Sequence, residues 1–485
     1  MGRSLTRLAC LVVVLGLALP LAAGAQQADA PPTPTVQELL RLIDTQQKLI
    51  EAQGRRLDAL QRQIDDLGAH PLASRNILPP TSLDGAPGVA AGAAGAAGQP
   101  KRAGGDDSDQ RGEWPEKPRD LVSVGDFPGS FKIPGSDAAF RLGGMVRVNW
   151  VTTLDPLLVD DKFITADIPV DDPTAPAGGS VDVMAIPSRF NLDIRTPTGV
   201  GYMRAFLEAD FAGSDNTLRL RHAFGQWRRF LFGQTWTTFS DPEAVPDGID
   251  FEGLNAELHF RQPQVRWTWA AAEHLRVALA LENPDPEITG LTAANRRPDL
   301  ISRVRWEPET RRHLQTAAIF RQLKGFPSNA PANLVAANGW GVTVSGVWPS
   351  PVLSERDRVL FQVNRGTGIG HYINDLNAAG GQDAVYDATT NTVLALPALS
   401  GYASYEHWWS ARFHSAFTAG SVYVKNLDIE PAAAYHLTRR YSGNFIWSPI
   451  PRLDLVAEIL SGIRSNKDGH RENASQIQIG STFRF

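Results

Sequence analysis

Residues 476–485 read Gln-Ile-Gln-Ile-Gly-Ser-Thr-Phe-Arg-Phe, and this stretch decides the fold class. Apolar and polar side chains alternate along it, and successive side chains of a β-strand point to opposite faces. The apolar face consists of Ile477, Ile479, Phe483 and Phe485. The closing strand of a transmembrane β-barrel needs this pattern, with apolar side chains toward lipid and polar side chains toward water. An amphipathic edge strand of a soluble β-sandwich is the alternative interpretation.

The same alternation recurs through residues 139–485, and arginine is frequent on the polar face. In residues 189–195, three apolar residues alternate with polar ones, and a turn at 196–199 leads into a returning segment. A soluble sandwich would carry Lys, Thr and Glu on this face as readily as Arg. A lumen lined with cations is the simpler explanation, and an arginine-rich exposed surface is the alternative. The candidate pore-lining residues are Arg141, Arg147, Arg189, Arg195, Arg204, Arg219, Arg221, Arg266, Arg303 and Arg305.

The length of this region predicts the number of strands. A hairpin with one short turn and one longer loop uses roughly 40 to 45 residues, so residues 139–485 provide about eight hairpins. We therefore expect an all-β transmembrane barrel of about 16 antiparallel strands. A barrel of that size encloses an aqueous channel. The irregular stretches at 155–182, 284–298, 325–338 and 374–398 are the expected long outer loops.

One acidic stretch, residues 241–253, is predicted to be a constriction loop folded into the channel. It contains too much Pro and Gly for a strand. Its acids, facing arginines on the wall, would narrow the pore and create a transverse electric field. An ordinary exposed acidic loop and a calcium-binding loop are the alternatives. The five acids are Asp241, Glu243, Asp247, Asp250 and Glu252.

Residues 1–25 predict a secretory signal peptide. Two arginines precede an apolar run from Leu8 to Leu21, and small residues follow around a cleavage point after Ala25. The run is too short to span a bilayer as a helix, and no later segment stays apolar for long enough. The one cysteine, Cys10, lies within this peptide, so the mature chain has no disulfide and no cysteine site.

Residues 26–68 are predicted to form a periplasmic coiled-coil helix, because apolar residues recur there at heptad spacing. Ile at a with Leu at d favours two strands, but Leu40, Leu42 and Leu49 broaden the apolar face, which favours three. A lone amphipathic helix packed on a domain is the alternative. Residues 69–138 are the expected flexible linker and lead-in to the barrel.

No catalytic, metal-binding or cofactor-binding motif is apparent. The sequence lacks a His-Glu-x-x-His arrangement and a Gly-x-Ser-x-Gly elbow, and the glycines of 366–370 lack dinucleotide-binding spacing. We therefore expect no enzymatic activity, no metal and no cofactor. The net charge of −5 does not indicate nucleic acid binding. His222 falls on the apolar face of its segment, which suggests a buried interface between protomers.

Three stretches resemble the DcaP-type family of outer-membrane porins: Gly129–Ser136 running into Phe140–Gly144, Leu218–Gly225, and Gly233–Trp236. The order of signal, helix, linker and barrel is also similar, and Phe485 resembles the terminal signal that the barrel-assembly machinery recognises. The resemblance implies a homotrimer of 16-stranded barrels in the bacterial outer membrane, with the coiled coil in the periplasm. It also implies passage of small anionic solutes such as dicarboxylates.

Together, these features predict passive diffusion of small hydrophilic solutes, preferably anions, through a porin surrounded by outer-membrane lipids. Arginine suits such a path, because its planar and always charged group can pass a carboxylate from one bidentate contact to the next. Two other classes stay open. A structural barrel, tethered to the cell envelope through its coiled coil, would conduct negligibly, and an outer-membrane barrel enzyme would hydrolyse lipid.

Overall fold

The computed structural model of the protein describes residues 125–309, 312–327 and 332–485. The predicted signal peptide, the predicted coiled coil and residues 69–124 of the predicted linker lie outside the described residues.

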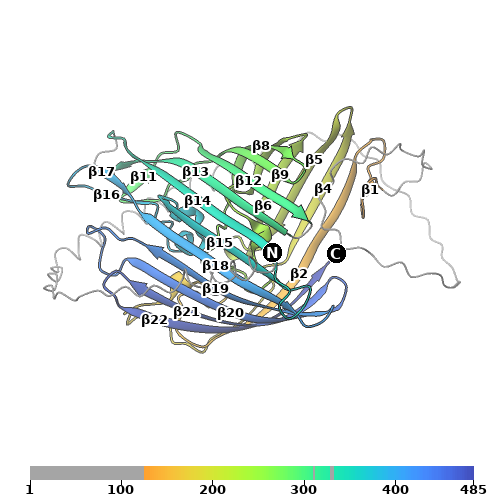
Figure 1. Ribbon diagram of the computed structural model, residues 1–485. Helices are drawn as coiled ribbons and strands as arrows, with labels where there is room; N and C mark the ends of the chain where they lie inside the picture. The colour runs from red at the N-terminus through yellow and green to blue at the C-terminus, as the bar shows by residue number, and fades with distance from the viewer. Residues whose placement is uncertain (1–124, 310–311, 328–331) are drawn as a thin grey trace, which may run out of the picture. The chain divides into compact units, whose positions relative to one another are not determined.

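Sixteen strands form one closed antiparallel sheet in the part of the chain that the structure describes (Figure 1). The prediction of a barrel of about 16 strands is therefore confirmed. The wall strands are β2 (Ala139–Thr153), β4 (Arg189–Thr198), β5 (Gly201–Asp210), β6 (Arg219–Trp227), β7 (Phe230–Trp236), β8 (Arg261–Ala272), β9 (Leu275–Glu282), β12 (Asp299–Glu309), β13 (Arg312–Pro327), β14 (Val335–Pro349), β15 (Arg358–Thr367), β18 (Pro397–Trp408), β19 (Phe413–Val424), β20 (Tyr435–Ile450), β21 (Leu453–Asn466) and β22 (Arg471–Arg484).

The first and last wall strands close the barrel. β2 pairs with β4 through Ala139–Met145 and with β22 through Met145–Thr153. Past the end of β22, the short strand β1 (Phe131–Lys132) continues along the same edge of β2. On the β4 side, the short strand β3 (Val181–Met184) extends the pairing in the other direction. Closure thus depends on hydrogen bonds between the two ends of the barrel sequence.

Most connections at one end of the barrel are short turns, and most connections at the other end are longer loops. In outer-membrane barrels, the short turns face the periplasm and the longer loops face the outside. The connections at the loop end are loop 1 (154–188), loop 2 (211–218), loop 3 (237–260), loop 4 (283–298), loop 5 (328–334), loop 6 (368–396), loop 7 (425–434) and loop 8 (467–470). They contain four 3₁₀ turns among the described residues: η1 (Thr165–Asp167), η2 (Ser214–Asn216), η3 (Pro242–Ala244) and η4 (Gly370–Tyr372).

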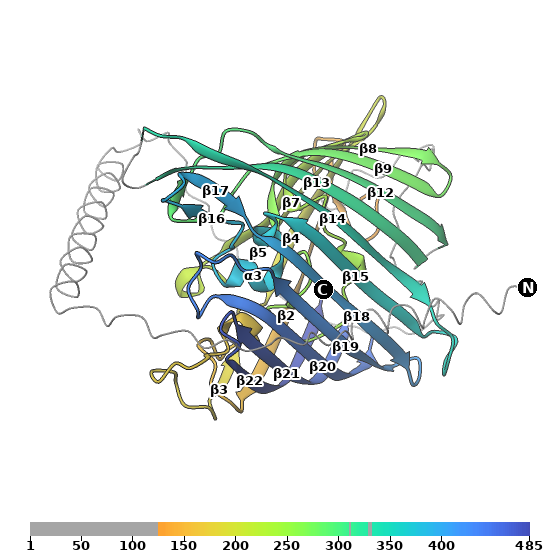
Figure 2. The same ribbon diagram turned by 60° about the vertical axis from the view of Figure 1, so that its left-hand side comes forward.

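Loops 4 and 6 contain short elements that the sequence pattern did not predict. Strands β10 (Ile288–Thr289), β16 (Ala384–Asp387) and β17 (Thr392–Ala395) form a separate three-stranded sheet, and Figure 2 shows β16 and β17 at the loop end of the barrel. Loop 4 also contains β11 (Leu291–Ala293), which pairs with β13, and loop 6 contains the helix α3 (Asn374–Ala378).

The loop predicted at 325–338 is wrong in its bounds. Gly325 on β13 pairs with Val335 on β14, so the two strands extend well into the predicted loop. The reason is that backbone pairing across the hairpin continues through residues whose side chains give no clear alternation.

Side-chain alternation separates lipid-facing from inward residues, and the loops fill part of the interior. On β22, Ile479 and Phe483 are exposed on the outer face, whereas Gln476 and Gln478 are buried inside. Residues of loops 1, 3 and 6 pack with inward wall residues into one hydrophobic cluster. This core therefore lies inside the barrel, where side chains of the inward-folded loops pack against the inner wall.

A β-bulge in β6 changes the expected position of His222. The register between β5 and β6 shifts so that Ala209 pairs with Leu220 but Glu208 pairs with His222. The extra residue turns His222 inward, where its Nδ1 lies 3.0 Å from Thr235 Oγ1. The prediction that His222 lies on the outer face is wrong, because a bulge shifts the alternation by one residue.

Candidate functional site

Loop 3 follows the inner wall of the barrel. Its outgoing half begins at Asp241, whose Oδ2 lies 2.8 Å from His313 Nε2 on β13 and 2.6 Å from Ser345 Oγ on β14. Further along, the Ile249 N–H donates to Glu458 on β21 at 2.7 Å. These contacts hold the outgoing half across consecutive inward faces from β13 to β21.

The returning half of loop 3 is bound to the same side of the barrel. The Asn364 Nδ2 on β15 donates to Ala256 O at 3.0 Å, and the Leu258 N–H donates to Gln362 Oε1 at 3.0 Å. The Asn374 N–H of loop 6 donates to Glu257 O at 3.0 Å. Loop 3 is therefore a hairpin laid against the wall and joined to loop 6.

The five acids predicted for a constriction divide into two groups. Asp241 and Asp250 are almost completely buried, and Asp250 pairs with Arg440 on β20 at 2.8 Å. Glu252 pairs with Lys162 of loop 1 at 2.8 Å. Glu243 and Asp247 have exposed carboxylates, 69% and 58% of each side chain being accessible. Three of the acids therefore fix the loop, and two face open space.

Asp241 is the most heavily bonded of these acids. Burial opposes its ionisation, but hydrogen bonds from His313 and Ser345 and the charge of Arg305 hold the pKa of this carboxyl below its usual value. Arg305 is itself buried, with Nη1 3.3 Å from Asp241 Oδ1, and it also contacts the Glu243 carboxylate. Arg305, one of the predicted pore-lining residues, thus anchors loop 3.

Three predicted arginines gather around Asp193 and form what we call the Asp193 cluster. Asp193 lies 2.8 Å from Arg204, 3.2 Å from Arg195 and 3.7 Å from Arg141. The Arg195 guanidinium also lies over the Phe127 ring at 4.4 Å, which is cation–π distance. The Asp193 carboxylate is buried under the guanidiniums, whereas the Arg141 side chain is 40% exposed. The cluster therefore presents positive groups to the interior.

Three further arginines surround Glu208 and Asp210 and form the Asp210 cluster. Arg221 lies 2.8 Å from Glu208 and 2.7 Å from Asp210, and only 10% of its side chain is exposed. Arg219 lies 2.8 Å from Asp210 and is 39% exposed, and Arg189 lies 3.7 Å from Glu208. Arg221 is thus enclosed by carboxylates, and Arg219 and Arg189 are more accessible.

The remaining predicted arginines, Arg147, Arg266 and Arg303, have no ion pair with a described carboxylate. Arg147 Nε donates to Asn149 Oδ1 at 3.1 Å on the same strand. Arg266 and Arg303 pair in register with the inward residues Ala280 and Ala278. All three therefore belong to the inner face of the wall.

Sequence reasoning missed the carboxylates that hold these arginines. Asp193, Glu208 and Asp210 occupy the same alternation phase as their arginine partners, and that shared phase was the available signal. It also missed Arg321, which is fully buried with Nε 3.1 Å from Asp299 and Nη1 3.0 Å from Asp383. No sequence signal could have found that contact, because Asp383 lies in loop 6 and pairs only after the loop folds inward.

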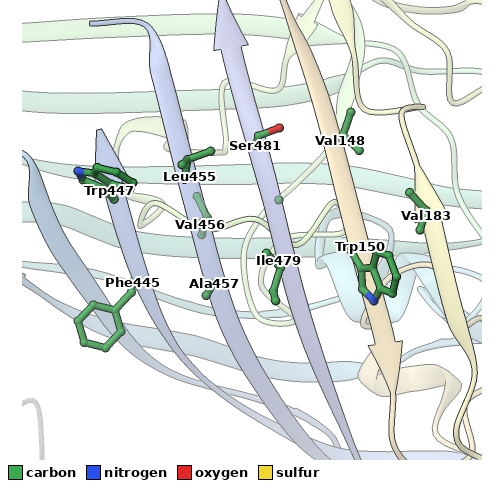
Figure 3. A pocket seen from close by; sticks show the side chains of 11 residues that line it. Val148, Trp150, Val183, Phe445, Trp447, Leu455, Val456, Ala457, Ile479 and Ser481 are labelled. Carbon is green, nitrogen blue, oxygen red and sulfur yellow. The ribbon is translucent and has the colours of Figure 1, made fainter. Parts of the chain in front are cut away.

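The outer face carries a separate apolar hollow of about 510 Å³. Figure 3 shows Trp150 of β2, Ile479 of β22, Ala457 of β21 and Phe445 of β20 side by side across the strands that meet at the closure. The Trp447 side chain also lines the hollow. These side chains lie outside the barrel, so the hollow belongs to the lipid-facing surface and not to the lumen.

No helix among the described residues has the length and apolarity to cross a membrane. Within the same ranges, no group of three or more His, Cys, Asp and Glu side chains is arranged to hold a metal ion.

Comparison with known proteins identifies the family. Residues 135–485 match the family described as DcaP outer membrane protein. The crystal structure of the outer membrane channel DcaP of Acinetobacter baumannii is similar over 75% of this chain and 100% of that chain, with 22% identity and a TM-score of 0.65. The anion-selective porin from Comamonas acidovorans is similar over 72% of this chain and 100% of that chain, with 11% identity and a TM-score of 0.47. No curated protein matches the chain. Because the family match spans every wall strand, this chain belongs to the DcaP outer membrane protein family.

Proposed function

We propose that this outer-membrane barrel is a channel for passive diffusion of small hydrophilic anions, with dicarboxylates as the favoured solutes. The main support is the partly exposed arginines on the inner faces of β2, β4, β5 and β6. Arg141, Arg189, Arg204 and Arg219 each keep roughly a third of the side chain accessible. A solute carboxylate can exchange with the wall carboxylates at such guanidiniums, and binding stays weak enough for release.

The wall carboxylates have a function of their own in this proposal. Asp193, Glu208 and Asp210 hold the guanidiniums in fixed positions, so the cations are arranged before a solute arrives. They also compete with the solute, which prevents tight trapping. A dicarboxylate can contact two guanidiniums of one cluster at once, whereas a monocarboxylate contacts fewer. The exposed Glu243 and Asp247 on loop 3 would exclude anions from their side of the path and keep them near the arginines.

The proposal extends to the assembly of the protein. We propose a homotrimer in which residues 26–68 form a periplasmic coiled coil, supported by the heptad pattern and its broadened apolar face. Residues 1–25 are the proposed signal peptide, and Phe485 is the proposed signal for the barrel-assembly machinery. Residues 69–138 are the proposed linker and lead-in to the barrel at 139–485.

Ion selectivity in planar bilayers tests the solute preference. Arg141→Gln/Arg204→Gln removes two accessible charges of the Asp193 cluster and leaves Arg195 with Asp193. We expect the reversal potential under a salt gradient to move toward zero, and the inhibition of chloride current by a dicarboxylate to weaken. The matched control is Arg365→Gln/Arg439→Gln, which removes two exposed arginines from the outer face.

The same measurements separate the proposal from its alternatives. An unchanged reversal potential in the inner-wall variant would remove the Asp193 cluster from the conduction path. Negligible conductance of the wild-type protein would favour the structural barrel. Release of fatty acid from phospholipid vesicles would favour the barrel enzyme.

A further inference from the structure

Four basic side chains lie on the outer face of the barrel near its loop end: Arg365 on β15, Lys425 just after β19, Arg439 on β20 and Arg471 on β22. All four are exposed. Their orientation follows from the alternation, because Asn364, Val424 and Arg440, the sequence neighbours of three of them, are buried inside. We call these four residues the basic band.

The register places the basic band along one row of paired residues that crosses the loop ends of neighbouring strands. Arg365 pairs with Leu399 on β18, Leu399 with Tyr423 on β19, and Tyr423 with Leu437 on β20. Leu437 pairs with Ser465 on β21, and Ser465 pairs with Arg471 on β22. Arg439 lies two residues along β20 from that row. Six consecutive strands are involved, so at about 4.8 Å per strand the band is about 24 Å wide.

The described residues place no carboxylate within ion-pair distance of the basic band. The exposed acids nearest in sequence, Asp428 and Glu472, form no ion pair with it either. Arg and Lys on a lipid-facing wall are unfavourable in the hydrocarbon and acceptable at its edge. The position and the missing partners therefore indicate a ligand in the headgroup layer.

The surface on the membrane side of the basic band is apolar. The outward residues Val363 on β15, Phe417 on β19 and Tyr441 on β20 are each about half exposed, and Tyr441 lies next along the outer face of β20 from Arg439. A ligand that touches both zones needs anionic groups at the top and hydrocarbon below them.

We propose that the basic band binds a phosphorylated lipid of the outer leaflet. Its phosphate groups lie against the guanidiniums and the Lys425 ammonium, and its acyl chains lie along the apolar strip below. Arginine matches the geometry of phosphate through paired N–H donors, and basic clusters next to a membrane select anionic headgroups. This role is independent of conduction, because the band faces away from the lumen.

Binding to the purified full-length protein tests the proposal. The probe is diphosphorylated lipid A in a zwitterionic detergent, detected by native mass spectrometry. The basic-band variant is Arg365→Gln/Lys425→Gln/Arg439→Gln/Arg471→Gln, and the matched control is Arg228→Gln/Arg229→Gln/Arg412→Gln/Arg452→Gln, in exposed turns at the opposite end. We expect the basic-band variant to lose at least about tenfold in affinity and the control to retain wild-type affinity.

Further binding measurements show which chemical groups of the lipid the basic band binds. Lipid A without its phosphates should bind all three proteins weakly, and raising the salt concentration should weaken wild-type binding of the diphosphorylated form. Inorganic phosphate that displaces the lipid at equal concentration would overturn the lipid assignment in favour of a free-phosphate site. Equal affinity of wild type and basic-band variant, or equal loss in the control, would overturn the proposal. Single-channel conductance of the basic-band variant should equal that of wild type, which also verifies its folding.

Discussion

At the scale of single residues, Asp357 shows how one carboxylate can organise a turn. It lies in the connection between β14 and β15 and is buried. It accepts hydrogen bonds from the Tyr405 hydroxyl at 2.6 Å and from the Trp408 N–H at 3.0 Å, and His407 Nδ1 lies at 3.0 Å. Burial opposes ionisation, but these donors and the Ser354 N–H lower the pKa of Asp357 to about 2.

Asp357→Asn tests the contribution of this charge to stability. The pKa is about 2 in the folded state and about 3.9 in an unfolded chain. The folded state therefore binds fewer protons, so the stabilisation is fully present above about pH 4 and is lost as the pH falls toward 2. We expect the variant to be about 1–3 kcal/mol less stable at neutral pH. Its free energy of unfolding should also vary less than that of wild type between pH 4 and pH 2.

Urea unfolding in detergent micelles, followed by tryptophan fluorescence across this pH range, measures both effects. Glu355→Gln, which changes an exposed acid in the same turn, is the control. An equally steep loss of stability below pH 4 in Asp357→Asn would assign the acid sensitivity to other carboxylates.

At the scale of elements, loop 3 depends on side chains from distant strands for its position. Its outgoing half has no regular structure beyond the single 3₁₀ turn η3, so its own backbone does not fix its path. Asp241, Ile249 and Ala256 instead bind to the wall at three separate points. Loops 1 and 6 are joined to the same assembly through Asp375, which accepts bonds from Thr165 and Tyr435.

Asp241→Ala should loosen loop 3 without changing the wall. The substitution removes the acceptor of His313 and one of the carboxylates that pair with the buried Arg305. A buried polar group left without its hydrogen-bond partner costs about 1–3 kcal/mol. Moving the loop off the wall relieves that cost. We expect single-channel recordings to show more frequent transitions between conductance levels.

Asp247→Ala is the control, because its carboxylate is on the same loop but exposed, where an ion pair contributes little. If both variants show the same frequency of transitions between conductance levels, the wall contacts of Asp241 do not determine the position of the loop.

At the scale of the whole molecule, closure of the barrel depends on a tight seam at Gly144. β2 changes its principal partner here, from β4 to β22. The Gly144 N–H donates to Phe485 O at 3.4 Å, and the Phe485 N–H donates to Gly144 O at 3.1 Å. A Cβ atom at Gly144 would lie 2.3 Å from Arg189 O and 2.9 Å from the Phe485 ring. A side chain there would therefore force the two ends of the sheet apart.

Gly144→Ala should reduce the yield of closed barrel, because the clash involves backbone that cannot move aside without breaking pairs. Gly143→Ala is a close control, since the nearest atom to its added Cβ is the flexible Asn191 side chain at 3.1 Å. Heat-modifiable mobility on detergent gels measures the folded fraction. Equal folded fractions for the two variants would show that the seam tolerates a methyl group at Gly144.

The sequence by itself determined the class of fold and the phase of most strands. Alternation is a local property, so Ile477 and Ile479 could be placed outward and the arginines of residues 189–195 inward from neighbouring residues alone. It also indicated that the stretch 241–253 is not a strand, because Pro and Gly act on the backbone locally. The predicted pore-lining residues included the four partly exposed arginines of the two clusters, Arg141, Arg189, Arg204 and Arg219.

Only the tertiary structure decided what each of those residues contacts. Arg141 and Arg305 are equivalent in the alternation, yet Arg141 is 40% exposed and Arg305 is buried against loop 3. The bulge that turns His222 inward depends on pairing with β5, and the burial of Asp241 depends on His313 and Ser345, which lie 72 and 104 residues away in the sequence. The physical reason is that alternation sets the face of a strand, whereas ion pairs and burial depend on which loops fold back onto that face.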